Sequence, residues 1–370
     1  MKFLLTIIQA VGLGCASAAA GRRVLHYLQL ESYQLPGYVK SVRRNAMRAL
    51  IPQIAMAAVG VAALRLSGLT GLALLLEALT AALLVWQAAK EKAKKPFVAT
   101  ERVKRLLAVH AAVNTVLALA LLTVSPVLGY LLPAFEPALL MLAALIAAPM
   151  EKHIAGQFIK DAQARLAAQP GLIKIGITGS YGKTSTKFLL RDILSVKYNV
   201  LATPSSFNTP MGVTRVIREQ LTPAHQVFIA EMGARHVGYI RELVELVHPQ
   251  MGLITSVGPQ HLDTFGTIER VRYTKYELIE GLPKDGTAVF ARDGAICEAL
   301  FERCPLERKY KPGMLVDAKN VACGPWGTRF TLTDVQTGEK ASCQTRLLGE
   351  HSISNLLLCC TAARALGMTL

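Results

Sequence analysis

The stretch Leu172–Thr186 reads LIKIGITGSYGKTST and decides the fold of the second half of the chain. Its first six residues form a short, mainly apolar run that is rich in β-branched side chains, which is typical of a buried parallel strand. A glycine-rich turn, Thr178–Thr186, comes next, and the helical pattern Phe188–Leu194 follows it. Strand, glycine loop and helix in this order form the context that a phosphate-binding loop requires.

Each part of this loop has a physical reason. Gly179 and Gly182 permit backbone angles that let successive N–H groups face one anion. The N-terminus of the helix adds a positive partial charge at the same point. Lys183 can reach the terminal phosphates of a nucleotide, and the Thr184 hydroxyl can ligate Mg²⁺. The standard spacing would place a glycine at Ile177. The loop is therefore a variant, and a plain surface turn is the alternative that its strand and helix argue against.

Two further strands predict where other polar groups lie. Val227–Ala230 is an apolar run, so Glu231 stands at its carboxyl end, where α/β sheets bind ligands. A carboxylate there suits Mg²⁺, which prefers oxygen ligands. Met251–Thr255 is a second such run, and His261 follows it. Taken alone, Glu231 is more often a surface charge, His261 a structural histidine and Lys275 part of a solvated helical face.

The variant loop belongs to a series of motifs between residues 178 and 355. In chain order the series resembles the Mur ligase family, most closely its D-alanyl-D-alanine-adding members, MurF. The motifs are Thr178–Thr186, Asn208–Val213, Ile229–Ala234, Ile254–Asp263, Lys275 within Tyr273–Leu278, and Gly349–His351 with Asn355. Several motifs in family order are far more specific than any one of them.

The resemblance implies a fold and an activity. The implied fold for residues 171–370 is the Mur ligase central domain, an α/β phosphate-loop domain with a mainly parallel sheet. The implied enzyme is an ATP-dependent carboxylate–amine ligase that works through an acyl phosphate, with ATP and Mg²⁺. Its implied substrates are a UDP-MurNAc-peptide and D-Ala-D-Ala, in the synthesis of peptidoglycan precursors.

The resemblance also implies a role for each candidate site residue. The implied catalytic residues are Lys183, His261 and Lys275. The implied nucleotide contacts are Gly179, Ser180, Tyr181, Gly182, Lys183, Thr184, Ser185, His351 and Asn355. The implied metal ligands are Thr184, Glu231, His261 and Lys275, the last through a carbamate formed with CO₂. The implied substrate contacts are Asn208 and Thr209. Carbamate formation requires a neutral amine, hence a lysine whose pKa is lowered by cationic or apolar neighbours.

Departures from the family pattern leave other functions open. Ser256 stands where the family has asparagine, and His351 is followed by Ser352 instead of asparagine. The family's UDP-binding domain has no counterpart, and the sequence stops at Leu370, where a third domain is expected to begin; we expect a truncated sequence. The alternatives are a polyglutamate synthase, a MurT-like amidating subunit (which would carry a CxxC zinc ribbon), or an ATP-binding membrane scaffold without turnover.

The first half of the chain has a different composition. The whole chain is 52% hydrophobic, and Leu, Ala and Val dominate up to Pro149. We therefore expect a membrane domain over residues 1–150, a helical connector over 151–170 and the ligase domain over 171–370. Five segments approach the ~20 apolar residues that cross a bilayer. They are residues 3–20, 50–66, 72–88, 106–122 and 127–148.

The positive charge indicates an orientation. The formal net charge is +16, and much of it lies in two loops beside apolar stretches, Arg22–Arg48 and Lys90–Arg105. Such basic loops are typical of the cytoplasmic side of a membrane, where they contact anionic lipid head groups. This placement accounts for the positive charge, so we expect no nucleic-acid partner. The N-terminus would then lie outside a bacterial inner (plasma) membrane and the ligase domain in the cytoplasm. A cleaved signal peptide is the alternative for the first segment.

Two features of this half have no fixed role. The seven cysteines of the chain show neither a disulfide framework nor a zinc-ligand spacing. Glu77 lies inside an apolar segment, where an acidic residue is a functional candidate or a polar contact between helices. The segments could place the ligase beside other cell-wall synthesis proteins or present a lipid-linked substrate, and both hypotheses stay open.

Overall fold

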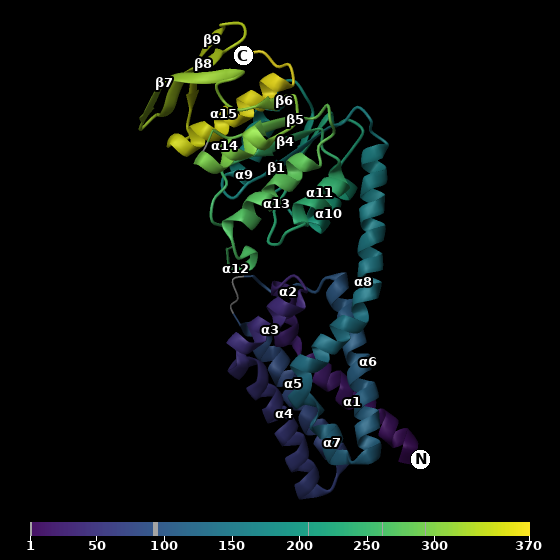
Figure 1. Ribbon diagram of the computed structural model, residues 1–370. Coiled ribbons are helices and arrows are strands. Elements are labelled where there is room, and N and C mark those ends of the chain that lie inside the picture. The colour runs from purple at the N-terminus through teal and green to yellow at the C-terminus, as the bar shows by residue number, and fades with distance from the viewer. Residues whose placement is uncertain (1, 92–94, 206, 261, 293) are drawn as a thin grey trace. The chain divides into compact units, whose positions relative to one another are not determined.

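The computed structural model of the protein describes residues 2–370 except 92–94, 206, 261 and 293. The chain divides into two compact units, Met1–Ile154 and Ala155–Leu370. The first is helical and the second is an α/β unit, and their elements are labelled in Figure 1. Each unit has its own hydrophobic cores.

Helices make up the first unit. They are α1 (Lys2–Ala20), α2 (Arg22–Leu30), α3 (Leu35–Arg44), α4 (Ala46–Ser67), α5 (Thr70–Lys90), α6 (Glu101–Val124), α7 (Pro126–Tyr130), a 3₁₀ helix η1 (Leu132–Phe135) and α8 (Glu136–Ala167). Within the described residues, five helical segments are long and apolar enough to cross a membrane, by length and composition. They are Phe3–Ala20, Ala46–Ser67, Thr70–Lys90, Glu101–Val124 and Leu132–Ala167.

Prolines divide the last of the apolar segments. The sequence predicts a span over residues 127–148 whose helix begins near Pro137, because Pro133 and Pro137 interrupt its start. In the structure α7, η1 and α8 occupy this region in succession, and α8 begins at Glu136. Pro126 and Pro133 lie in the first turns of α7 and η1, and Pro137 follows the first residue of α8. Proline lacks a backbone N–H and fits the first turn of a helix, so each proline begins a new one. Helix α8 then continues to Ala167, and the expected connector over 151–170 largely belongs to it.

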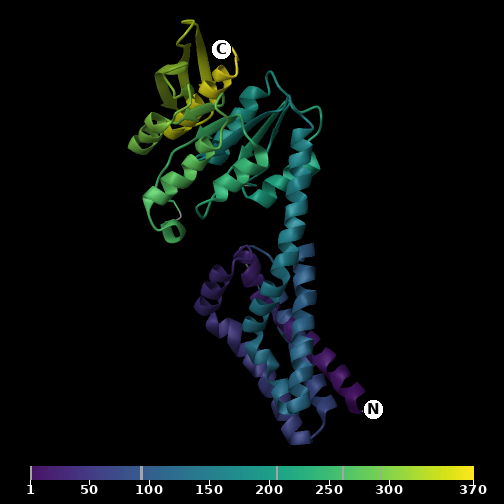
Figure 2. The same cartoon turned by 45° about the vertical axis from the view of Figure 1, so that its right-hand side comes forward.

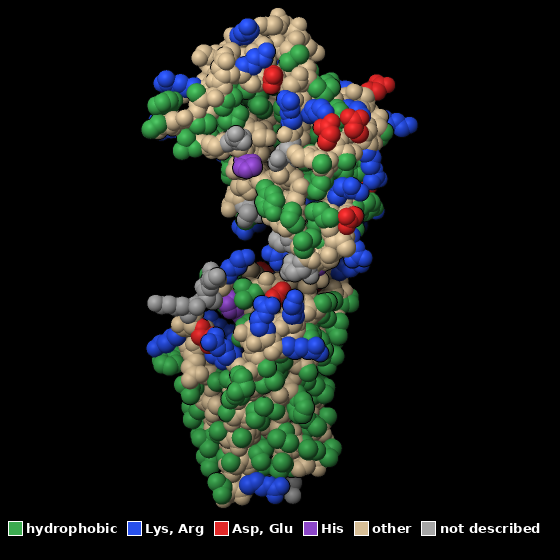
Figure 3. Space-filling view, turned by 60° about the vertical axis from the view of Figure 1, so that its left-hand side comes forward, with side chains coloured by type: hydrophobic (Ala, Val, Ile, Leu, Met, Phe, Trp, Pro, Cys, Tyr) green, Lys and Arg blue, Asp and Glu red, His purple; other side chains and the backbone are tan. Residues whose placement is uncertain are grey.

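The outer surface of the helical unit is apolar. Large hydrophobic side chains are exposed along its long helices, including Ile51, Ile54, Leu75, Leu79 and Leu83. Figure 3 shows such side chains covering the sides of this unit on the face drawn, with Lys and Arg gathered mainly at one end. A soluble domain rarely exposes so large a continuous apolar surface.

A parallel sheet forms the centre of the α/β unit. Its strands are β1 (Ile173–Thr178), β2 (Val200–Ala202), β3 (Val227–Glu231), β4 (Met251–Ile254), β5 (Thr287–Phe290) and β6 (Arg308–Tyr310). The order is β2-β3-β1-β4-β5-β6, and every neighbouring pair is parallel. The predicted, mainly parallel α/β sheet is confirmed.

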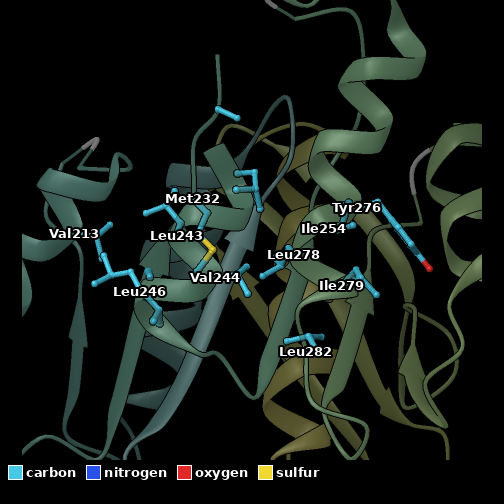
Figure 4. Close-up of a cluster of buried hydrophobic side chains, with 14 of the residues drawn as sticks. Val213, Met232, Leu243, Val244, Leu246, Ile254, Tyr276, Leu278, Ile279 and Leu282 are labelled. Carbon is cyan, nitrogen blue, oxygen red and sulfur yellow. The ribbon is translucent and has the colours of Figure 1, made fainter. Parts of the chain in front are cut away.

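Helices cover both faces of this sheet, as the two views in Figures 1 and 2 show. Helices α9 (Lys183–Leu194) and α15 (Glu350–Ala365) share a core with Ile175 and Ile177 of β1. On the opposite face lie α10 (Pro210–Gln220), α11 (Tyr239–Val247), α13 (Ile268–Glu280) and α14 (Gly294–Arg303), with the short α12 (Leu262–Phe265) preceding α13. Their apolar side chains contribute to the cluster in Figure 4, where Leu243 and Val244 of α11 and Leu278 of α13 are labelled. Side chains alternate along each strand, so a fully buried strand supplies both cores.

A small antiparallel sheet adjoins α15. Its strands are β7 (Val316–Gly324), β8 (Gly327–Asp334) and β9 (Lys340–Thr345), in that order. Phe330 and Leu332 pack with Ile353 of α15 in a separate small core. This sheet is absent from the sequence-based expectations.

Candidate functional site

The candidate site lies at the carboxyl ends of three neighbouring strands. Strand β1 pairs with β3 on one side and with β4 on the other. The chain leaves β1 for the distant edge strand β2, then returns to β3, so the strand order reverses at β1. In open α/β sheets this reversal leaves a crevice beyond the strand ends, where ligands bind.

Two glycines shape the loop after β1. Gly179 has φ +150°, and a Cβ there would lie 1.9 Å from Oγ1 of Thr255. Gly182 has φ +79° and is the N-cap residue of α9. These are backbone conformations that favour glycine, and at Gly179 the neighbouring strand also leaves no room for a side chain. Both glycines that the sequence singles out are thus required by the geometry.

The loop after β4 holds the glycine loop in place. The backbone N–H of Ser180 donates to the carbonyl of Ser256 at 2.7 Å, and the buried Ser180 hydroxyl donates to the carbonyl of Gly258 at 2.9 Å. The Thr255 hydroxyl donates to the carbonyl of Tyr181 at 2.6 Å. Ser180, expected as a nucleotide contact, therefore directs its hydroxyl to the neighbouring loop.

Lys183 is the first residue of α9 and folds back over the loop. Its Nζ donates to the carbonyl of Gly179 at 2.7 Å and to that of Ser180 at 3.0 Å. Burial lowers the pKa of Lys183, while the nearby Glu231 carboxylate raises it. The loop therefore places an amine at the position where phosphate oxygens would gather.

Glu231 ends β3 beside this loop and is 1% exposed. Its Oε2 accepts from the Thr184 hydroxyl at 3.0 Å, and its Oε1 accepts from Nδ2 of Asn208 at 3.0 Å. The Nζ of Lys187 also donates to Oε2, at 3.0 Å. The hydroxyl of Thr184 and the carboxylate are hard oxygen donors in contact with each other, so this pair fits the donor set that Mg²⁺ prefers.

Lys275 lies on α13 and is 1% exposed. Burial, and secondarily the charge of Lys183, lower the pKa of Lys275 to about 7, against the opposing effect of Glu277. The Glu277 carboxylate itself accepts from the backbone N–H groups of Gly238 and Arg241 at 2.9 and 3.0 Å, at the start of α11. Lys275 therefore meets the neutral-amine requirement for carbamate formation near neutral pH.

A cavity of about 800 Å³ lies between the glycine loop and α15. The residues lining it include Tyr181, Gly182, Ser185, Phe188, His351 and Asn355. The amide of Asn355 packs against the loop, since a Cβ on Gly182 would lie 2.9 Å from its Nδ2. His351 and Asn355, which lie far from the glycine loop in the sequence, thus share one cavity with it.

Other predicted site residues have different positions. The Thr209 hydroxyl accepts from the N–H of Gly212 at 3.3 Å and caps α10, while its neighbour Asn208 faces Glu231. His261 lies outside the described residues. The described part of the chain contains no cluster of three or more His, Cys, Asp or Glu side chains that could hold a metal.

Sequence reasoning missed Lys187 and Thr255. The buried positions of α9 are Thr186, Lys187, Leu190 and Leu194, which lie on one face of the helix. A lysine at helical spacing with buried leucines was therefore a detectable signal of a buried charge. Thr255 gave no such signal, because its contacts to residues 178 and 181 depend on strand pairing.

Comparisons with known proteins agree with this geometry. The profile of the Mur ligase middle domain matches residues 177–363. The UDP-N-acetylmuramoyl-tripeptide–D-alanyl-D-alanine ligase of Mycobacterium tuberculosis is 35% identical over 208 residues, covering 53% of this chain and 38% of that enzyme. A crystal structure of MurF from Acinetobacter baumannii is 27% identical, with a TM-score of 0.55 over 58% of this chain and 48% of that one.

A second solved structure contains a nucleotide. It is the MurF ligase of Thermotoga maritima in complex with ADP, 25% identical, with a TM-score of 0.53 over 58% of this chain and 50% of that one. The chain spans half or less of the length of each of these three proteins. The matched family domain includes the glycine loop, Glu231, Lys275 and the residues of α15 that line the cavity. The chain belongs to the Mur ligase family and resembles MurF.

Proposed function

We propose that this chain contains the ATP-binding and phosphoryl-transfer site of a membrane-anchored ligase that joins a carboxylate to an amine. The proposed substrates are UDP-MurNAc-tripeptide and D-Ala-D-Ala, after the ligases that it resembles. One observation carries the proposal: the glycine loop with Lys183, the Thr184–Glu231 pair and the buried Lys275 lie at the ends of adjacent strands or on helices beside them.

The glycine loop would bind the triphosphate of ATP. Backbone N–H groups of residues 179–184 and the N-terminus of α9 supply positive partial charge. Lys183 would exchange its two loop carbonyls for phosphate oxygens. The cavity beside Gly182 would take the nucleoside, with Tyr181, Ser185, His351 and Asn355 around it.

The reaction would proceed in two displacements. A carboxylate oxygen of the peptide substrate attacks the γ-phosphorus, the bond to the β–γ bridging oxygen breaks, and ADP leaves. The amine nitrogen of D-Ala-D-Ala then attacks the carbonyl carbon of the acyl phosphate, the C–O bond to phosphate breaks, and the nitrogen loses a proton. Lys183 holds and neutralises the transferred group, which is the main task of a protein in phosphoryl transfer.

Thr184 and Glu231 would hold Mg²⁺ beside the loop. His261 and a carbamylated Lys275 would hold a second ion, as the family resemblance implies. When bound, the metal supplies positive charge that screens the phosphate oxygens from the incoming carboxylate. The pKa of about 7 for Lys275 supports this role, because only a neutral amine reacts with CO₂.

Asn208 and Thr209 belong to the segment proposed to approach the UDP-muramoyl substrate. Asn208 donates to Glu231, so a substrate that contacts this segment would be linked to the proposed metal ligand through one hydrogen bond. The Thr209 hydroxyl supports the segment by capping α10.

The helical unit is proposed to anchor the ligase in a bacterial inner membrane. Five apolar helical segments, an apolar outer surface and the basic sequences of residues 22–48 and 90–105 support this assignment. The N-terminus would be outside and the α/β unit cytoplasmic, with residues 1–150 as the membrane domain. The anchor would keep the ligase beside other membrane-bound steps of cell-wall synthesis.

The test is identification of the product by mass spectrometry. The chain, extended to the natural end of its reading frame because turnover is expected to need the third domain, is given ATP, UDP-MurNAc-tripeptide and D-Ala-D-Ala in detergent. We expect UDP-MurNAc-pentapeptide with one ADP for each product formed. Parallel reactions replace D-Ala-D-Ala with glutamate or ammonium. In a second assay, ATP labelled with ¹⁸O at the β–γ bridge reports acyl phosphate formation without any amine. Bound ATP with neither label scrambling nor product would overturn the proposal in favour of a scaffold.

A further inference from the structure

Lys187 lies one turn after Lys183 on α9 and has no apparent place in the reaction. Its side chain is 0% exposed. A buried ammonium group loses its hydration, which is unfavourable unless a partner compensates. The partners of Nζ are Oε2 of Glu231, at 3.0 Å, and the carbonyl oxygen of Ser205. Lys187 is therefore fixed against the carboxylate that is expected to ligate the metal.

Every described hydrogen bond to the carboxylate of Glu231 uses electron pairs that a metal would need. Oε2 accepts from Lys187 and Thr184, and Oε1 accepts from Asn208. A divalent cation must share or displace these donors. The carboxylate that attracts the cation is thus already engaged in the nucleotide-free protein.

The charges around Glu231 also oppose a free cation. The ammonium of Lys187 balances the single negative charge of Glu231, and the amine of Lys183 is close enough to interact with the same carboxylate. Two amines therefore face one carboxylate. In a buried site, where water screens little, an added divalent cation would be repelled. The triphosphate of ATP would bring the missing negative charge.

We infer that Lys187 is a positioning residue that neutralises Glu231 until nucleotide binds, so that divalent metal enters the site together with ATP and not before it. The inference rests on the proposed function, because it concerns the order in which the components of that site assemble. The same amine donates to Ser205, three residues before Asn208, so it also holds the segment that approaches the substrate.

The experiment measures Mn²⁺ binding to the full chain in detergent without nucleotide, by counting free Mn²⁺ with electron paramagnetic resonance. Lys187→Met keeps the unbranched stem and removes the charge. We expect this variant to bind Mn²⁺ about tenfold more tightly or better, because it lacks one positive charge that repels the cation at short range. Lys187→Arg restores the charge and should return the weak binding of the wild type.

Two further variants locate the effect. Arg191→Gln removes a positive charge one turn further along α9, where Arg191 pairs with Asp192, and should leave Mn²⁺ binding unchanged. Adding Glu231→Gln to Lys187→Met should abolish the gain. The inference is overturned if wild type and Lys187→Met bind Mn²⁺ equally, or if the gain survives in the double variant.

Thermal unfolding will show whether Lys187→Met folds. If it does not, wild type and Glu231→Gln alone still test the inference. Wild-type protein should bind Mn²⁺ weakly without nucleotide, and Glu231→Gln should not weaken it further. Tight binding that is lost in Glu231→Gln would contradict the inference. Because no assay here needs ligation, a chain that makes product but shows no Lys187 effect refutes this inference alone. A chain with the Lys187 effect but no product refutes only the proposed function.

Discussion

In the α/β unit the buried carboxylate of Glu231 accepts hydrogen bonds from Thr184, Lys187 and Asn208, whereas the buried carboxylate of Glu77 in the helical unit has no hydrogen-bond partner among the described residues. The two units also differ outside. Leucines such as Leu79 are exposed on the helical unit, while the central strands of the α/β unit are buried.

This contrast indicates which ligands and surroundings suit each unit. In the α/β unit, strand ends gather polar groups at one edge, where a charged ligand could replace their mutual bonds. In the helical unit, exposed leucines are favourable only against an apolar surrounding, and a buried acid is tolerated between helices. The proposed surroundings follow this difference: phosphate and metal for the α/β unit, lipid for the helical unit.

Removing the Lys183 amine should have the largest effect on the function proposed for the α/β unit. Lys183→Ala deletes the amine over the glycine loop, and we expect the rate of ATP-dependent product formation to fall about 100-fold or more. Phosphate release and product mass give the measurement. Lys197→Ala, an exposed lysine just beyond α9, is the control and should retain the full rate. Equal rates in the two variants would remove Lys183 from the mechanism.

A methyl group at Gly179 should disturb the same loop without changing charge. Gly179→Ala places Cβ against Oγ1 of Thr255 at a φ of +150°, so we expect a loss of about 3 kcal/mol in the stability of the α/β unit, with weaker ATP binding. Gly171→Ala is the matched control, because a Cβ there meets nothing within 4 Å. Thermal unfolding and ATP titration measure both, and a stable, ATP-binding Gly179→Ala would contradict the loop geometry.

A lysine placed on the outer surface of each unit should show whether the two units have different surroundings. Leu79→Lys puts a charge where the side chain is 58% exposed, and in a bilayer we expect it to cost about 3 kcal/mol of insertion. Val196→Lys changes an 84% exposed residue of the α/β unit and should cost little. The fraction of chain in the membrane pellet after carbonate washing is the measurement. Equal fractions would argue against a membrane anchor.

The amine of Lys275 should titrate near neutral pH. Its pKa is lowered from 10.5 to about 7, so the folded protein carries the neutral amine above pH 7 while the unfolded chain stays protonated up to about 10.5. Between these values the unfolded state binds more protons, and this group makes stability rise with pH. With ¹³C-bicarbonate, we expect a carbamate NMR signal that grows through pH 7 and is lost in Lys275→Met. A midpoint near 10 would show an ordinary, solvated lysine.

The smallest effect is expected at the unpartnered acid. Glu77→Gln removes no described hydrogen bond, so we expect unfolding stability within about 1 kcal/mol of wild type. Glu136→Gln is the comparison, because Glu136 accepts from Ser17 at 3.1 Å and lies 3.1 Å from His110. It should cost more, and thermal unfolding in detergent measures both. A large loss at Glu77 would instead indicate a role that its surroundings do not explain.

Local sequence determined much of this protein. The strand, glycine loop and helix around Gly179 and Lys183 are adjacent in the chain, so their pattern predicts the structure directly. The strands ending at Glu231 and Ile254 were visible as apolar runs, and the resulting parallel sheet is confirmed. The apolar segments were visible for the same reason, because helix length and composition are local properties.

Only the tertiary structure decided which groups meet. The bond from Lys187 to Glu231 spans 44 residues, the bond from Thr255 to Tyr181 spans 74, and the Asn355 amide packs against Gly182. No local pattern encodes such contacts, since strand order and helix packing bring these residues together. The sequence supplied the chemical groups at the strand ends, and the folding of β1 between β3 and β4 placed them within hydrogen-bonding distance.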